Sequence, residues 1–127
     1  MLMHNRRIDV PEGAVVRKLR WSGARTGTEK GDLVPAIGYE ITLDAMPDFR
    51  FFVDERSEYL ELDDEMVYFP LWVVSEISSG AMLACGESRS EAIDRASATL
   101  RRVGRDLFVA TVQKVLAEYG DAQSEAA

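Results

Sequence analysis

The feature that most constrains the fold is a strict alternation of apolar and polar residues from Ile37 to Leu43. Apolar side chains occupy the odd positions, and Gly, Glu and Thr occupy the even ones. Side chains of a strand point alternately to its two faces, so this pattern predicts a strand with one buried face and one wet face. Turn residues from Asp44 to Asp48 and a second alternation from Phe49 to Val53 complete a predicted hairpin.

Four further segments are predicted strands: 14–21, 58–62, 67–77 and 81–85. The first also carries a helix-start signal, and strand is the favoured interpretation. The third contains Pro70, which has no N–H to donate to a sheet. That strand is therefore expected either to lie at a sheet edge or to be interrupted at the proline.

A capping-box pattern predicts the start of a helix, because Ser88 lies three residues before Glu91. Two apolar stripes follow it, rotated relative to each other. Gly104 is the expected position of the break, Asp106 is a candidate cap for a second helix, and Gly120 marks its end.

Together these elements predict an α+β fold. We expect a mostly antiparallel sheet of four to six strands, followed by one kinked helix or two consecutive C-terminal helices packed on one face. A length of 127 residues with 46% hydrophobic residues fits a single domain spanning residues 1–127. Residues 1–8 and 121–127 are expected to be flexible.

Compartment is inferred from what the sequence lacks. The longest apolar runs, such as Phe69 to Val74, are far shorter than a membrane-spanning helix. The first residues do not resemble a secretory signal. The single cysteine, Cys85, cannot form an internal disulfide, which agrees with a reducing compartment. A cytoplasmic protein that does not enter membranes is expected.

Charge is distributed unevenly along this chain of net charge −7. Residues 1–30 carry seven Arg/Lys against three Asp/Glu, whereas residues 31–65 carry two against eleven. Such an acidic surface repels nucleic acid, so a cationic partner is expected instead. The alternatives are that the acids serve only solubility, or that cationic residues near Trp21 stack a nucleobase. Those cationic residues are Arg17, Lys18, Arg20 and Arg25.

Residues able to perform catalysis are scarce. His4 is the only histidine and lies in the N-terminal segment, and Cys85 has no histidine close in the sequence. The clustered acids lack the glycine and terminal Glu of an EF-hand loop. Residues 23–30 lack the Gly-Lys-Ser/Thr order of a phosphate-binding loop. We therefore expect no enzyme, no metal and no cofactor.

Residues 72–100, WVVSEISSGAMLACGESRSEAIDRASATL, resemble the strand, glycine turn, strand and capped helix of the HicB-like antitoxin family. The similarity centres on Gly86-Glu87-Ser88, followed by Glu91-Ala92-Ile93, Ala96 and Leu100. It departs from the family at Ser78-Ser79-Gly80, where an acidic-Leu-Pro-Gly turn is usual. The resemblance implies a non-enzymatic protein that occludes a small basic toxin.

Three functions are compatible with the sequence. The favoured one is a small acidic interaction module of the antitoxin, immunity or phage-type inhibitor kind, which binds a basic protein partner. The alternatives are an assembly subunit forming homo-oligomers through residues 67–77, and a ligand-binding protein or enzyme with a pocket between sheet and helix. The predicted partner-binding residues are Glu58, Tyr59, Glu61, Asp63, Asp64 and Glu65.

Overall fold

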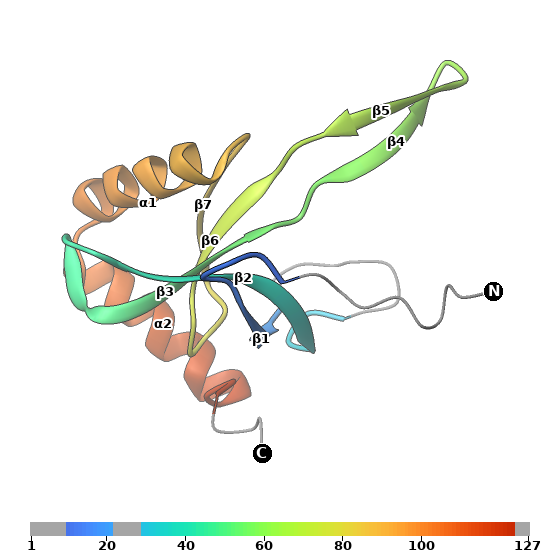
Figure 1. The fold of residues 1–127 in the computed structure, drawn as a ribbon. Coiled ribbons are helices and arrows are strands. Elements are labelled where there is room, and N and C mark those ends of the chain that lie inside the picture. The colour runs from blue at the N-terminus through green and yellow to red at the C-terminus, as the bar shows by residue number, and fades with distance from the viewer. Residues whose placement is uncertain (1–9, 22–28, 124–127) are drawn as a thin grey trace.

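A computed structural model describes residues 10–21 and 29–123 of the chain, and within them it has strands followed by two helices (Figure 1). The strands are β1 (Val15–Arg20), β2 (Leu33–Leu43), β3 (Met46–Glu55), β4 (Glu58–Leu62), β5 (Glu65–Phe69), β6 (Trp72–Glu76) and β7 (Met82–Gly86). The helices are α1 (Arg89–Val103) and α2 (Arg105–Tyr119).

The strands form two antiparallel sheets. The main sheet has the order β1-β2-β3-β6-β7, and β4 and β5 pair only with each other in a second, two-stranded sheet. Both helices follow the last strand, so the α+β fold expected from the sequence is confirmed.

The predicted hairpin is formed by β2 and β3, but its turn is tighter than the sequence suggested. Leu43 pairs with Met46, which leaves only Asp44 and Ala45 as the connecting residues. The expected turn from Asp44 to Asp48 is therefore wrong at its C-terminal end. Because Met46 is buried against the helices, extending β3 backward adds a large apolar side chain to the core.

The expected single strand over residues 67–77 is interrupted at Pro70, one of the two outcomes that the proline predicted. Its first part is β5, and its second part is β6. β6 lies between β3 and β7, so both of its edges are hydrogen-bonded within the sheet. Of the two parts, only β5 has an edge that pairs with no other described strand.

The helix start at Ser88 is confirmed. The Ser88 side chain accepts a hydrogen bond from the Glu91 backbone N–H at 3.1 Å, and the Glu91 carboxylate accepts one from Glu87 N–H at 2.7 Å. The break falls at Gly104, which joins the two helices with φ of 86°. The expected cap at Asp106 is wrong, because Gly104 is the N-cap of α2 and Asp106 lies in its first turn. Neither described helix is long and apolar enough to cross a membrane.

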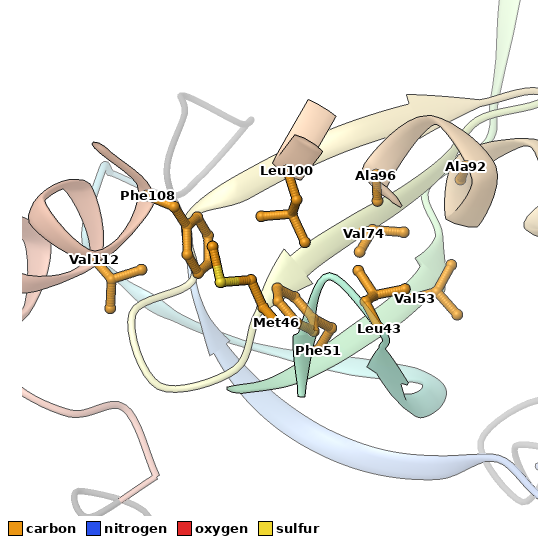
Figure 2. Packing of buried hydrophobic residues seen from close by; sticks show 10 residues of the cluster. All are labelled: Leu43, Met46, Phe51, Val53, Val74, Ala92, Ala96, Leu100, Phe108 and Val112. Carbon is orange, nitrogen blue, oxygen red and sulfur yellow. The ribbon is translucent and has the colours of Figure 1, made fainter. Parts of the chain in front are cut away.

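The larger of two buried clusters lies between the main sheet and the two helices (Figure 2). The smaller one consists of Leu19, Phe52 and Ile77. Phe51 and Val53 of β3 point toward the helices, where Phe51 meets Phe108 of α2 with ring centroids 5.9 Å apart. On α1 the buried positions are Ala92, Ala96 and Leu100. The small alanines let α1 approach the sheet closely. The large side chains of the sheet then fill the space between helix and sheet, so the packing there is dense.

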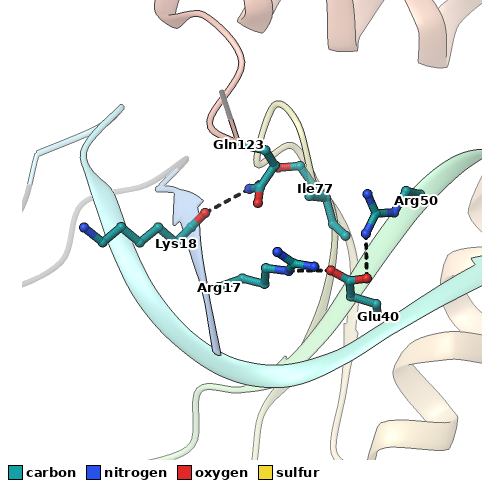
Figure 3. Close-up of polar contacts among 6 residues, drawn as sticks. All are labelled: Arg17, Lys18, Glu40, Arg50, Ile77 and Gln123. Atoms are coloured by element: carbon teal, nitrogen blue, oxygen red, sulfur yellow. Dashed lines mark hydrogen bonds and ion pairs between the residues drawn. The ribbon is translucent and has the colours of Figure 1, made fainter. Parts of the chain in front are cut away.

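The chain beyond α2 folds back onto the sheet. Ala122 is fully buried, and its N–H donates to the Ser78 carbonyl at 2.9 Å. The Gln123 side chain donates to the Lys18 carbonyl at 3.0 Å and to that of Ile77 (Figure 3). Flexibility was expected from residue 121 onward, but these contacts fix residues 122 and 123. Residues 124–127 and residues 1–8 lie outside the described part of the chain.

Candidate functional site

The β4–β5 hairpin, residues 58–69, projects away from the rest of the molecule, and we call it the arm (Figure 1). It continues the line of β3 and β6, the central pair of the main sheet, on the side away from the helices. All but one of its strand residues are exposed. An isolated two-stranded hairpin without buried side chains is at best marginally stable. The arm depends on its base, which is continuous with the packed main sheet.

The tip of the arm is a two-residue turn made by Asp63 and Asp64. Leu62 pairs with Glu65 across it, and the two aspartates have φ of 50° and 64°. Positive φ at both central residues is the geometry that matches the twist of a hairpin, and Asp tolerates it better than most side chains. The turn therefore presents two carboxylates at the farthest point of the arm.

The strand register gives the arm two different faces. Directly paired residues of an antiparallel hairpin share a face. One face, which we call the apolar face, combines Leu60 and Leu62 with Val67 and Phe69. Glu58 and Glu65 lie on the same face, one at each end of this apolar group. The group is partly open to solvent, with Leu62 50% exposed and Phe69 42% exposed.

The opposite face, which we call the tyrosine face, carries Tyr59, Glu61, Met66 and Tyr68. The Tyr59 and Tyr68 rings lie 5.0 Å apart between centroids. Tyr59 and Met66 are the most exposed large apolar side chains of the described chain, at 66% and 65%. Large aromatic and Met side chains left open to solvent in one place are typical of surfaces that bind other proteins.

Acidic residues in the arm differ from those on the main sheet. Glu40, Asp48 and Asp54 of the main sheet each form an ion pair with an arginine. Within residues 10–21 and 29–123, no ion pair involves the carboxylates of the arm. These unpaired carboxylates are Glu58, Glu61, Asp63, Asp64 and Glu65. The arm is therefore a concentrated negative field without internal compensation.

Hydrogen bonds fix the base of the arm. The Tyr68 hydroxyl donates to the Glu55 carboxylate at 2.6 Å, and the Ser57 hydroxyl donates to the same oxygen at 2.7 Å. The Tyr68 and Ser57 hydrogen bonds lower the pKa of Glu55, and the Glu55 carboxylate in turn raises the pKa of Tyr68. Both bonds therefore persist at neutral pH. They hold the arm in a defined direction where it leaves the sheet.

Of the cationic residues predicted to form a patch near Trp21, Arg17 is paired with the main sheet, and Arg25 lies outside the described residues. Arg17 donates to Glu40, which also accepts from Arg50 at 2.6 Å (Figure 3). Burial tends to raise the pKa of Glu40, but these arginine bonds outweigh it and lower that pKa. The Arg56 guanidinium covers the Trp21 ring at 4.5 Å from its centroid. That ring face is therefore occupied by the protein's own side chain.

Other residues considered from the sequence do not form a reactive centre in the described chain. Cys85 is exposed on β7, and His4 and most of the glycine-rich 23–30 segment lie outside the described residues. Within the described ranges, no group of three His, Cys, Asp or Glu side chains is arranged to hold a metal ion.

No protein family, curated protein or solved structure matches the chain. The site is therefore defined by its own geometry. All six predicted residues lie on the arm, but not on one face. Glu58 and Glu65 lie on the apolar face, Tyr59 and Glu61 on the tyrosine face, and Asp63 and Asp64 at the tip. Sequence reasoning missed the apolar partners Leu60, Leu62, Met66 and Phe69. Alternation of Leu and Glu over residues 58–62 was the available signal, but it was interpreted only as a strand.

Proposed function

We propose that the protein is a non-enzymatic interaction module whose arm binds a basic protein partner, as antitoxins, immunity proteins and phage-type inhibitors do. The observation that carries this proposal is the combination of unpaired carboxylates and exposed apolar side chains on one projecting hairpin. The carboxylates steer a cationic partner toward the arm, and the apolar and aromatic side chains supply contact area once it has docked. The HicB-like segment, residues 72–100, lies outside the arm and adds no support.

The charge of the arm also favours a foreign partner over a second copy of the chain. Two arms laid against each other would place up to five carboxylates of each copy in one interface, and residues 58–69 contain no Lys or Arg to offset them. Like charges facing each other are unfavourable across an interface. A cationic partner removes that repulsion, so it is the favoured occupant over the homo-oligomer.

Neutralising the arm tests the proposal. The isosteric variant E58Q/E61Q/D63N/D64N retains side-chain size and removes four charges. We expect a basic protein retained from lysate of the source organism by the wild-type chain to bind this variant at least about tenfold more weakly. Raising the salt concentration should weaken wild-type binding in the same direction. Quantitative mass spectrometry followed by titration with the purified partner measures both effects.

A control variant with the same change in charge distinguishes an effect of the arm's carboxylates from an effect of the net charge of the protein. E12Q/D44N/E87Q/D94N removes four exposed carboxylates outside the arm. Its affinity for the partner should stay within about twofold of wild type, since distant surface charges are screened. Equal weakening by both variants would show that binding is unspecific attraction to an acidic protein. Analytical sedimentation could instead show that the wild-type chain forms a dimer and the neutralised variant does not. That result would favour a second copy of the chain as the occupant of the arm.

A further inference from the structure

A cavity separate from the arm lies where the end of β1 meets α2 and the β6–β7 turn. Its volume is about 190 Å³. An apolar cavity of about 150 Å³ accommodates benzene, whereas sites for drug-sized ligands exceed about 300 Å³. The volume thus suits one ring with a small substituent and is too small for a nucleotide or a large cofactor.

The charges around this cavity are opposite to those of the chain as a whole. Arg20, Lys30 and Lys114 line it, and Glu118 is the one acidic side chain among the described residues of its lining. The chain carries a net charge of −7, so this is a local positive field in an acidic protein. A positive field in a partly enclosed space attracts a small anion.

Two aromatic side chains, Trp21 and Tyr119, form part of the apolar wall together with Ala81 and Val115. The Arg20 guanidinium lies 5.8 Å from the centroid of the Tyr119 ring, and it donates to the Gly31 carbonyl at 2.9 Å. Arg20 is only 8% exposed, so its charge is held in place and poorly screened by solvent. Aromatic walls beside a fixed cation suit a ligand with a planar apolar body and an acidic end.

Close backbone contacts hold the wall in shape. A Cβ on Gly31 would lie 2.3 Å from the Tyr119 ring, and one on Gly80 would lie 2.0 Å from the Arg20 carbonyl oxygen. Both glycines have positive φ, which most other residues adopt only with strain. The cavity is therefore preorganised, which reduces the entropy lost when a ligand binds.

From these observations we infer that this cavity binds a small aromatic carboxylate. Trp21 and Tyr119 contact the ring, and Lys114 and Arg20 attract the carboxylate. This binding is independent of the arm, so the two proposals succeed or fail separately. A ligand of this size with one charge is expected to bind weakly, with a dissociation constant on the order of 1 mM.

An NMR titration with phenylacetate and its neutral counterpart phenylacetamide tests the inference. We expect saturable shifts at the backbone amides of Ala81, Thr111 and Val115 with phenylacetate, and at least about fivefold weaker binding of the amide. Lys114→Met should weaken phenylacetate binding about three- to fivefold, because it removes the ammonium and retains the stem. Lys18→Met, which alters an exposed lysine outside the cavity lining, should leave binding unchanged.

Three results would overturn the inference. The first is the absence of saturable shifts at these amides below about 20 mM phenylacetate. The second is equal affinity for the acid and the amide, which would show that the positive field has no role. The third is an equal effect of the Lys114 and Lys18 substitutions. Each variant changes an exposed position, so loss of folding does not complicate the comparison.

Discussion

Phe51→Ala is expected to lower the free energy of unfolding by about 3–5 kcal/mol, the largest effect of any single core truncation considered. Phe51 has no exposed surface and lies on β3, at the centre of the main sheet. Its ring packs against Phe108, so alanine would open a cavity where sheet and α2 meet (Figure 2). Urea denaturation followed by circular dichroism measures the change.

Leu107→Ala provides the matched control for this prediction. Leu107 precedes Phe108 on α2 but is 60% exposed, so its truncation should cost no more than about 0.5 kcal/mol. A loss below about 1 kcal/mol for Phe51→Ala would contradict the core described above. Loss of similar size for both variants would indicate that α2 is packed in another rotation.

Glu76→Ala is expected to cost about 2–4 kcal/mol, although no other charged group pairs with this side chain in the described structure. Glu76 is 3% exposed, and its carboxylate accepts from the backbone N–H groups of Ser78 and Ser79 at 2.9 and 2.8 Å. Both serine hydroxyls donate to it as well. Alanine would leave the buried donors of Ser79, and the half-buried donors of Ser78, without this acceptor at the β6–β7 turn.

Thermal and urea unfolding measure the Glu76 effect, with Glu87→Ala as the control. Glu87 lies in an exposed position just before α1, so its truncation should change stability by at most about 0.5 kcal/mol. If Glu76→Ala were as mild as the control, the turn would not depend on the carboxylate. The pairing of β6 with β7 would then be stabilised by the backbone hydrogen bonds between the two strands alone.

Local patterns were sufficient to predict most of the secondary structure. The alternation from Ile37 to Leu43 predicted a strand, and the Ser88 cap predicted a helix start. The expected wet face is wrong at Gly38, which is buried because the Phe52 side chain of β3 lies against it. On the other face Leu43 is buried, whereas Ile37 and Ile41 are only partly buried. Gly104 interrupts the helices because its φ of 86° suits glycine. Each of these signals depends on residues within a few positions of each other, so no knowledge of tertiary contacts was needed.

Features that depend on distant contacts were not predicted. Burial of Ala122 is decided by its bond to Ser78, forty-four positions earlier in the sequence. Pro70 was recognised as an interruption, but nothing local indicated that β5 leaves the main sheet while β6 enters its centre. Strand order results from competition among all strands for partners, and that competition is not visible in one segment.

The candidate site was predicted in part, for a similar reason. Acidic residues are clustered in the sequence over residues 58–65, and they remain close in the structure because they lie on one hairpin. Exposure of Leu60 and Phe69 is not such a property, because the same alternation fits a strand that is half buried. Only the projection of the arm from the sheet shows that both faces are open.

Photo-crosslinking from the arm in cells of the source organism tests the central claim most directly. A photoreactive amino acid replaces Leu60 on the apolar face, and the control replaces Leu107 on α2, which is also exposed. We predict an adduct with a basic protein from position 60 alone, and its loss when E58Q/E61Q/D63N/D64N is combined with the probe. No adduct from position 60, or one that also forms from position 107 or persists after neutralisation, would contradict the account.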